Sequence, residues 1–342
     1  MSLWVTILAG GVGSRFWPVS TPDRPKQLLP LNSERPLIVD TMERASALTD
    51  VDRIRILAGS HLVEPMRRAL PGLHESAFLV EPRARGTAPV LVWAAWTLSK
   101  KDPEAILVSL HSDHVVNPPD AFVSTVMRAA RMARDHRRLM TVAVRPDRPE
   151  VGYGYIQPGD EIGEGFEVAA FHEKPDPETA TRYVEGGYLW NSGIFVWPAR
   201  TFLDEVRARA PEIGRLMVHL EEGRPERFFD EAPKISVDEA VLERSGRVAA
   251  VEAGFRWDDV GSWEALARNR SPGPEGNVVK GKAHFVESRN NIVYSEDKPV
   301  VLFGVDDLVV VRTGEVTLVT RRDRAPRLKE LLDELPDELR NP

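Results

Sequence analysis

A short span near the start of the chain combines the residue types that bind a polyphosphate. Residues 8–31 read LAGGVGSRFWPVSTPDRPKQLLPL, with glycines at 10, 11 and 13. Glycines leave backbone N–H groups uncovered and permit positive φ, so phosphate oxygens can lie against the main chain. Arg15, Arg24 and Lys26 follow and supply positive charge. The span is therefore predicted to be a phosphate-binding loop.

The loop matches neither of the two common glycine-loop templates. A P-loop has Lys and Ser/Thr directly after its last glycine, and the dinucleotide fingerprint has a third glycine at a position occupied here by Phe16. The pattern thus points away from P-loop NTPases and dehydrogenases. A plain strand-to-helix turn with surface arginines is the alternative, and the ordered Pro18, Pro25 and Lys26 argue against it.

A carboxylate follows a second apolar run. Asp113 comes just after the predicted strand 106–110, where it could hold Mg²⁺, a hard cation that prefers oxygen ligands and shares them with phosphates. A zinc site made of His111, Asp113 and His114 is the alternative. Neighbouring residues of an extended chain point to opposite faces, so we expect this trio to be poorly arranged around one soft metal.

A further pair of carboxylates lies in RWDDVGSWEAL, residues 256–266. Asp258 and Asp259 precede a glycine turn and a predicted helix. Taken alone, this segment suits a helix cap better than a metal site.

The hydrophobic pattern indicates an α/β fold. Short apolar runs bounded by turn or charged residues are typical of buried parallel strands, and amphipathic stretches between them indicate crossover helices. Ligands of such sheets bind beyond the carboxyl ends of the strands, so the glycine loop and Asp113 could face one crevice. The predicted strands are 5–9, 54–58, 78–80, 106–110 and 140–144, and the predicted helices are 37–48, 62–70, 88–100 and 121–135.

The second half of the chain is less regular. Strands at 153–157, 167–172 and 194–197 are expected in a substrate-binding subdomain inserted over the sheet. Proline and glycine in SPGPEG, residues 271–276, suggest a boundary between a catalytic domain of residues 1–270 and a β domain of residues 277–342. Apolar runs that begin at 292, 300, 308 and 316 suggest stacked short strands, and leucines of 328–335 suggest a closing helix.

These motifs resemble a known family. GGVGSRFWPVS followed by RPKQLLPL is similar to the signature of sugar-nucleotide pyrophosphorylases, and the Phe-Trp-Pro and Pro-Lys-Gln variants resemble the mannose-1-phosphate guanylyltransferase branch. The resemblance implies a Rossmann-like, mainly parallel sheet and a small C-terminal domain resembling a left-handed β-helix, for which a simple meander is the alternative. It also implies Mg²⁺-dependent formation of GDP-mannose and pyrophosphate from GTP and α-D-mannose 1-phosphate.

The resemblance implies roles for individual residues. The catalytic cations would be Arg15 and Lys26, and the metal ligands would be Asp113 and Asp259 rather than Asp258. His111 stands where the family usually has Pro, and in EPRARGTAPV, residues 81–90, Gly86 stands where Asn is usual. The implied nucleotide-binding residues are Gly10, Gly11, Gly13, Ser14, Arg15, Arg85 and Thr87. The implied sugar-phosphate residues are Gly154, Glu173, Lys174 and Asn191, and the family also places Asp238 near the sugar.

Composition excludes several other classes. The 342 residues carry a net charge of −7, which argues against general nucleic-acid binding, and they contain no cysteine, which excludes disulfides and thiolate catalysis. No apolar run approaches the roughly 18 residues of a membrane helix, and no secretory leader precedes the first strand. We therefore expect no membrane or nucleic-acid partner and a cytoplasmic location. The C-terminal strands resemble the β-helix appended to many pyrophosphorylases, which often mediates assembly, and this resemblance implies a homodimer formed through the C-terminal region.

Two other functions compete with this prediction. A related enzyme that uses glucose 1-phosphate or another nucleotide would need only one altered contact, worth about 1–3 kcal/mol. A catalytically silent subunit that binds sugar nucleotides would be expected to lack the lysine or one acidic ligand, whereas Lys26, Asp113 and Asp259 are all present.

Overall fold

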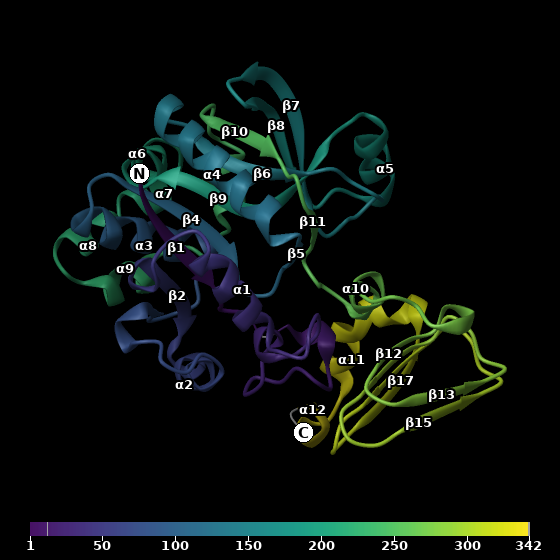
Figure 1. The fold of residues 1–342 in the computed structure, drawn as a ribbon. Helices are drawn as coiled ribbons and strands as arrows, with labels where there is room; N and C mark the ends of the chain where they lie inside the picture. The colour runs from purple at the N-terminus through teal and green to yellow at the C-terminus, as the bar shows by residue number, and fades with distance from the viewer. Residues whose placement is uncertain (12, 341–342) are drawn as a thin grey trace.

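A computed structural model describes residues 1–11 and 13–340. Within these residues, nine strands form one sheet in the order β3-β2-β1-β4-β9-β6-β10-β8-β7 (Figure 1). The strands are β1 Ser2–Leu8, β2 Ile54–Gly59, β3 Phe78–Glu81, β4 Ala105–His111, β6 Leu139–Val144, β7 Gly154–Ile162, β8 Gly165–Glu173, β9 Leu189–Pro198 and β10 Val248–Glu252.

The sheet is parallel on one side and mixed on the other. Strands β3, β2, β1 and β4 run parallel, as do β6 and β10, whereas β9 lies antiparallel between β4 and β6. Strands β7 and β8 pair antiparallel and extend the same sheet. The expected subdomain lying over the sheet is therefore wrong, because β7, β8 and β9 belong to the sheet itself.

Helices cover both faces of the central part of the sheet, which explains why strands such as β1 and β4 are largely apolar. In β1, Trp4 and Leu8 pack into one core with α3 and α6, while Val5 and Ile7 pack into the other with α2 and α4. A strand buried on both faces shows no polar alternation. None of the helices in the described residues is long and apolar enough to cross a membrane. The helices of this part are α1 Leu37–Ser46, α2 Ser60–Ala69, α3 Thr87–Lys101, α4 Pro119–His136, α5 Pro177–Glu185, α6 Ala199–Arg209, α7 Pro211–Gly214, α8 Met217–Glu221, α9 Pro225–Glu231 and α10 Trp263–Arg268.

The C-terminal strands form two small sheets, because the chain winds in short coils that add strands to the two sheets in turn. Strands β12, β14 and β16 pair in parallel, β13 and β15 pair in parallel beside them, and β17 returns antiparallel on β16. A meander would pair consecutive strands antiparallel, so the parallel pairing of alternate strands rules it out. The elements are β12 Val278–Lys280, β13 Ala283–Val286, β14 Ile292–Ser295, β15 Val300–Phe303, β16 Leu308–Arg312, β17 Thr317–Arg321, α11 Leu328–Glu334 and α12 Asp337–Arg340.

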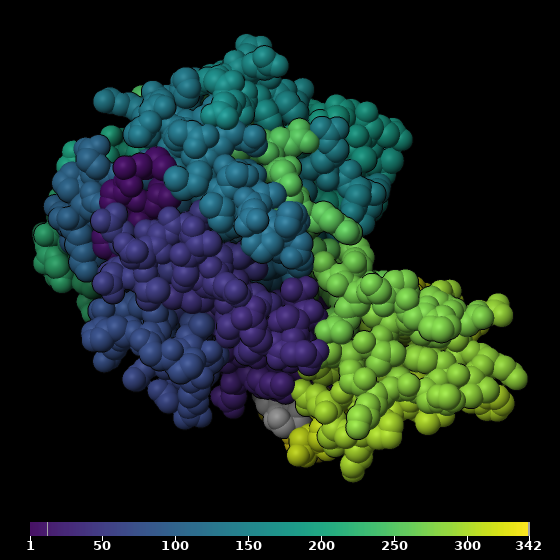
Figure 2. Space-filling view, viewed as in Figure 1, coloured from purple at the N-terminus to yellow at the C-terminus, as the bar shows by residue number. Residues whose placement is uncertain are grey.

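The C-terminal lobe packs against the segment that follows the glycine loop (Figure 2). Phe16 and Trp17 share a core with Trp263, Tyr294 and Leu328, and the Phe16 and Trp263 rings meet edge to face with centroids 5.0 Å apart. This contact braces the short 3₁₀ turn Ser14–Phe16 from outside the catalytic sheet.

Arg24 belongs to this contact and not to the phosphate-binding loop. Its guanidinium lies 2.5 Å from the Glu296 carboxylate, in the turn after β14. The expectation that Arg24 adds charge beside the phosphates is therefore wrong, because a carboxylate of the C-terminal lobe already holds it.

Candidate active site

The glycine loop begins where β1 ends, at the carboxyl edge of the parallel strands. Gly13 has φ +74°, and a Cβ built on it would lie 2.3 Å from the Cβ of Lys26. The Ser20 hydroxyl donates to the Gly13 carbonyl at 2.6 Å, and the Gln27 side-chain amide donates to the Ala9 carbonyl at 2.9 Å. Glycine at 13 is thus required for the Lys26 stem to pass directly beside the loop.

Lys26 joins three distant parts of the chain. Its ammonium lies 2.7 Å from Oδ2 of Asp113 and donates to the backbone carbonyl of Asp259, also at 2.7 Å. Burial alone would raise the pKa of Asp113, but the Lys26 charge leads the opposing effects and the pKa falls to about 2. The Asp113 carboxylate is therefore ionised at any physiological pH.

Asp259 sits in a tight turn between β11 (Arg256–Asp258) and α10. Its Oδ1 accepts hydrogen bonds from the Tyr153 hydroxyl at 2.7 Å and the Gly261 N–H at 2.9 Å. Arg15 donates to the Gly261 carbonyl at 3.2 Å, so the turn connects to the glycine loop. Val260, a β-branched residue, adopts φ +49°, a strained conformation of the kind that clusters at functional sites.

Asp258 faces away from this cluster. Its carboxylate accepts from Arg268 at 2.9 Å and from the Val260 N–H at 2.7 Å. The two adjacent aspartates thus differ. Asp258 stabilises the turn through its carboxylate, and Asp259 contacts Lys26 through its backbone carbonyl.

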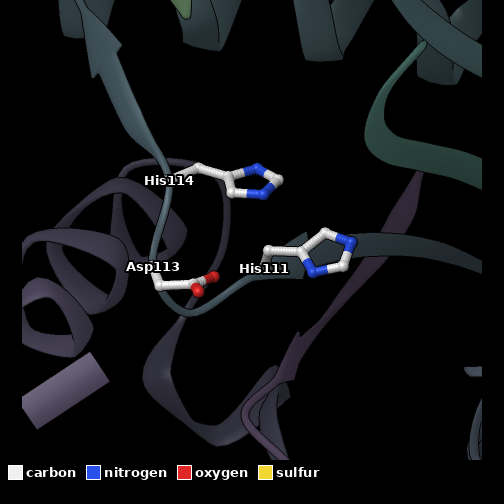
Figure 3. A group of neighbouring side chains, drawn as sticks. All are labelled: His111, Asp113 and His114. Carbon is white, nitrogen blue, oxygen red and sulfur yellow. The ribbon is translucent and has the colours of Figure 1, made fainter. Parts of the chain in front are cut away.

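His111, Asp113 and His114 lie close together, with their candidate ligand atoms all within 4.8 Å of one another (Figure 3). The expectation that they point to opposite faces is wrong, because the chain turns at residues 112 and 113 instead of continuing β4. The two imidazole rings stack with centroids 4.5 Å apart, and Nδ1 of His114 accepts from the Trp257 indole at 3.1 Å. Burial lowers the pKa of both histidines, which favours the neutral rings.

The donor set fits a hard divalent cation better than zinc. Lys26 contacts the Asp113 carboxylate and the backbone carbonyl of Asp259, and within the described residues no hydrogen bond is made to Oδ2 of Asp259, which leaves that carboxylate oxygen available as a ligand. A zinc ion lies in the plane of each imidazole that binds it, and two nearly parallel stacked rings do not share such a point. Oxygen ligands of this kind suit Mg²⁺.

A cavity of about 310 Å³ opens beside the glycine loop and reaches Asp113. Glu81, at the end of β3, lines it, and within residues 1–11 and 13–340 its carboxylate makes no hydrogen bond or ion pair. Burial raises the pKa of Glu81. An unpartnered, half-buried carboxylate in a cavity is poised to accept N–H donors from a ligand. The lining residues include Leu8, Gly10, Gly11, Gly13, Leu57, Glu81, Thr87, Val90 and Asp113.

Arg85 and Thr87, the two predicted nucleotide-binding residues of segment 85–88, differ in whether they line this cavity. Thr87 lines it, and its hydroxyl accepts from the Val237 N–H at 2.9 Å. The Arg85 guanidinium instead donates to the carbonyls of Phe229 and Asp230 at 2.8 and 2.9 Å, and Arg85 is not among the lining residues. Its assignment to the nucleotide stays a prediction.

The predicted sugar-phosphate residues gather on β7, β8 and β9. Gly154 pairs with Glu173 across β7 and β8, and a Cβ on Gly154 would lie 2.5 Å from the Glu173 carboxylate. Asn191 on β9 donates to Asp238 at 2.9 Å, and Lys174 lies 2.9 Å from Glu173. The Glu173 hydrogen bond raises the pKa of Lys174, and burial followed by the Glu173 charge raises the pKa of Asp238 to about 7.

Sequence motifs predicted no role for Glu81 or Tyr153 and did not require one for Asp238. Glu81 opens the motif EPRARGTAPV directly after a strand, the same signal that singled out Asp113. Tyr153 and Asp238 carry no such signal, since only tertiary contacts bring them to Asp259 and Asn191.

Two family models together match most of the chain. The model described as "Nucleotidyl transferase" matches residues 5–271, and the model described as "MannoseP isomerase/GMP-like beta-helix domain" matches residues 281–335. The C-terminal coils therefore have the β-helix character that the resemblance implied.

Individual proteins agree with these models. The chain is 35% identical to "Mannose-1-phosphate guanylyltransferase" of Salmonella muenchen, covering 98% of this chain and 74% of the relative, and 35% identical to the protein of that name from Escherichia coli K12, covering 97% and 73%. A crystal structure from Thermus thermophilus, described as a "mannose-1-phosphate geranyltransferase", superposes with a TM-score of 0.91 at 32% identity, covering 98% of this chain and 99% of that one. The chain belongs to the nucleotidyl transferase family and, over nearly its whole length, is a relative of the bacterial mannose-1-phosphate guanylyltransferases.

Proposed function

We propose that this protein transfers a guanylyl group from GTP to α-D-mannose 1-phosphate, giving GDP-mannose and pyrophosphate. The observation that carries the proposal is the contact of Lys26 with the Asp113 carboxylate and with the Asp259 turn, since Asp113 and the glycine loop line the same cavity. A silent binding subunit would not need this arrangement, because binding alone requires no charge stabilisation of a reacting phosphate.

The reaction is a single in-line displacement. A phosphate oxygen of the sugar phosphate attacks the α-phosphorus of GTP, a new P–O bond forms, and the bond from the α-phosphorus to the bridging oxygen breaks as pyrophosphate leaves. The glycine loop binds the triphosphate through its N–H groups. Lys26 and Arg15 stabilise the α-phosphoryl group and the leaving pyrophosphate, so positioning and charge supply most of the catalysis.

Asp113 and Asp259 would hold Mg²⁺. When bound there, the ion would neutralise charge on the reacting phosphates. Lys26 contacts the side chain of Asp113 and the backbone carbonyl of Asp259, so the chain positions both residues before substrate arrives.

The sugar phosphate would bind against β7, β8 and β9. Glu173 and Asn191 present planar polar groups to the sugar hydroxyls, and Lys174 provides a point charge for the phosphate. Because Gly154 on β7 has no side chain, the Glu173 carboxylate of the paired strand β8 can lie directly beside it.

Glu81 is the group best placed to select guanine. Guanine carries two adjacent donors, N1–H and the 2-amino group, and a carboxylate can accept both. Glu81 has no competing partner among the described residues and lies in the cavity with Gly10 and Thr87. Adenine and the pyrimidines of UTP and dTTP do not offer this pair of donors.

Pyrophosphate release tests the reaction directly. Purified protein with Mg²⁺ is mixed with each of the four NTPs or dTTP, together with mannose 1-phosphate or glucose 1-phosphate. Release confined to GTP with mannose 1-phosphate supports the proposal. A different preferred pair would move the protein to a related activity, and no release with any pair would favour the silent sugar-nucleotide-binding subunit.

The Glu81→Gln variant tests the base contact. An amide N–H would face a guanine N–H, so we expect kcat/KM with GTP to fall by about 10- to 200-fold, which corresponds to about 1–3 kcal/mol. The wild-type preference for GTP over ITP, which lacks the 2-amino group, should shrink in parallel. Glu75→Gln, at an exposed position just before β3, is the control. An unchanged GTP to ITP ratio in Glu81→Gln would remove Glu81 from base recognition.

A further inference from the structure

The Tyr153 hydroxyl lies between an arginine and the Asp259 carboxylate. We propose that Tyr153 is a positioning residue that holds Asp259 in the orientation required to bind the divalent cation. This inference rests on the proposed function, because it presumes that Asp259 is a metal ligand. Tyr153 itself touches neither the cation nor the reacting atoms.

The contacts around Asp259 define how this works. Oδ1 accepts from the Tyr153 hydroxyl at 2.7 Å and from the Gly261 N–H at 2.9 Å. With both donors on the same oxygen, the carboxylate cannot rotate freely, and Oδ2 remains without a hydrogen bond in the described part of the chain. Oδ1 is thus held by two hydrogen bonds, and Oδ2 is left available to bind the cation.

Packing around the Tyr153 ring also restricts the position of its hydroxyl. Tyr153 is 7% exposed, and its ring meets Trp190 and Trp257 edge to face with centroids 5.1 and 5.0 Å away. Arg148 approaches the hydroxyl oxygen at 3.5 Å, which directs the hydroxyl proton toward Asp259. A ring held on two sides by tryptophans gives its hydroxyl one position.

The backbone of the same residue reaches the sugar-phosphate side. The Tyr153 carbonyl accepts from the Lys174 N–H at 3.2 Å, where Lys174 adopts φ +46°. Tyr153 therefore positions a metal ligand with its side chain and a phosphate-binding lysine with its main chain. Substitution by phenylalanine removes the first contact and leaves the second.

The expected effect follows from the behaviour of other metal sites. Groups that hydrogen-bond a metal ligand typically change metal affinity by about 10- to 100-fold when they are removed. In Tyr153→Phe we expect the dissociation constant for the cation to rise by about 10-fold or more. The KM for mannose 1-phosphate should stay within about 2-fold, since Lys174 keeps its backbone anchor.

The experiment measures metal binding without turnover. Mn²⁺, which reports its free concentration by electron paramagnetic resonance, is titrated into full-length protein with GTP and no sugar phosphate, for wild type and Tyr153→Phe. Tyr155→Phe is the matched control, because its buried hydroxyl accepts from the Glu150 N–H at 2.8 Å and makes no contact with Asp259. Weaker Mn²⁺ binding in Tyr153→Phe alone supports the proposal, and equal affinities in all three proteins overturn it.

A double variant separates positioning from a general structural effect. If Tyr153 acts through Asp259, Tyr153→Phe combined with Asp259→Asn binds Mn²⁺ no more weakly than Asp259→Asn alone. Additive losses would mean that Tyr153 acts elsewhere. Should Tyr153→Phe fail to fold, Tyr153→Leu keeps an apolar side chain against the tryptophans and has no group that can hydrogen-bond Asp259 or bind a cation, and the same titration decides. Wild type that binds Mn²⁺ but releases no pyrophosphate would refute the proposed function, and the titration of the variants would still decide the role of Tyr153.

Discussion

At the scale of single residues, the site depends on one buried lysine. Lys26 is 7% exposed and contacts Asp113 and the Asp259 carbonyl, so its charge is held in a fixed place where water screens it little. A cation positioned before the reaction stabilises developing phosphate charge without further reorganisation.

The Lys26→Ala variant should therefore lose turnover. We expect kcat for pyrophosphate release to fall by about 10²-fold or more, in line with the removal of one charge-stabilising group. Lys101→Ala, at the exposed end of α3, should match wild type. Turnover of Lys26→Ala close to that of wild type would contradict the assigned role.

Asp238 predicts a pH dependence of stability. Burial, together with the Glu173 charge, raises its pKa from 3.8 to about 7. The folded protein holds this proton more tightly than the unfolded chain, so the contribution of Asp238 to stability is complete below about pH 4 and is lost as the pH rises to about 7. The charged form is then the destabilised one.

Asp238→Asn removes this loss, since asparagine cannot ionise and its Oδ1 can still accept from Asn191. The melting temperature of the variant should exceed that of wild type at pH 8 by a few degrees, and the difference should vanish near pH 4. Asp160→Asn, at an exposed position of β7, is the control. A difference that does not change between pH 4 and pH 8 would show that Asp238 has an ordinary pKa.

Part of this residue-level picture could be predicted. Strand-end reasoning singled out Asp113, and the resemblance chose Asp259 over Asp258, whose carboxylate the structure pairs with Arg268. The proximity of His111 to His114 could not be predicted, because a turn at residues 112 and 113 replaces the extended chain that was assumed.

At the scale of elements, backbone geometry decides which residue can occupy the start of α3. Gly86 has φ +83° and ψ −177°, a region essentially limited to glycine, and a Cβ there would lie 2.4 Å from the Ile235 carbonyl oxygen. The Arg85 carbonyl accepts from the Ile235 N–H at 3.1 Å, so the two segments run in direct contact. This close approach explains a glycine where the family usually has asparagine.

Gly86→Ala should consequently destabilise the protein more than a matched glycine substitution. Gly72→Ala is the control, because Gly72 has φ +89° but nothing within 4 Å of a Cβ. Both variants incur backbone strain of about 1–2 kcal/mol, and Gly86→Ala adds a steric cost of about 1–3 kcal/mol. Urea unfolding measures both free energies, and equal losses would show that the Ile235 contact relaxes at no cost.

Most strands and helices of residues 1–144 followed closely from the hydrophobic pattern, since each strand of the parallel half is largely apolar, whereas α5 to α9 and β10 were not predicted. Strand order did not follow. The antiparallel insertion of β9 between β4 and β6, and the place of β10 between β6 and β8, depend on pairing between segments far apart in the chain. A local hydrophobic pattern does not show which distant strand a segment pairs with.

At the scale of the whole molecule, the C-terminal lobe has an uncovered apolar face. On the two-stranded sheet of β13 and β15, Val286 pairs with Phe303 and His284 with Val301. Val301 and Phe303 are 68% and 69% exposed. We propose that a second copy of the chain covers this face, since patches of exposed apolar side chains mark interaction sites.

Sedimentation velocity at micromolar concentration tests this dimer. Wild type should sediment as a dimer, and Phe303→Ser should shift the population toward monomer. Val319→Ser, a similarly exposed valine on β17 of the other small sheet, should leave the dimer intact. A wild type that sediments as a monomer would remove the proposal.

The docking of the lobe on residues 16–31 was not predictable either. The sequence predicts that Arg24 is one of the cations of the phosphate-binding loop, yet its ion-pair partner Glu296 lies 272 positions further along the chain. Only the folded arrangement shows that one arginine of the motif joins the lobes while Arg15 and Lys26 remain beside the turn at Asp259.

The span of the Lys26 contacts has a consequence for synthesis. Before the ribosome reaches residue 259, the glycine loop, Lys26 and Asp113 are already present, but the Asp259 turn, 233 positions beyond Lys26, is not. A nascent or prematurely terminated chain of that length carries the loop and one carboxylate without the second. We therefore expect fragments that end before residue 259 to lack nucleotidyl transfer, because the second proposed metal ligand is missing from them.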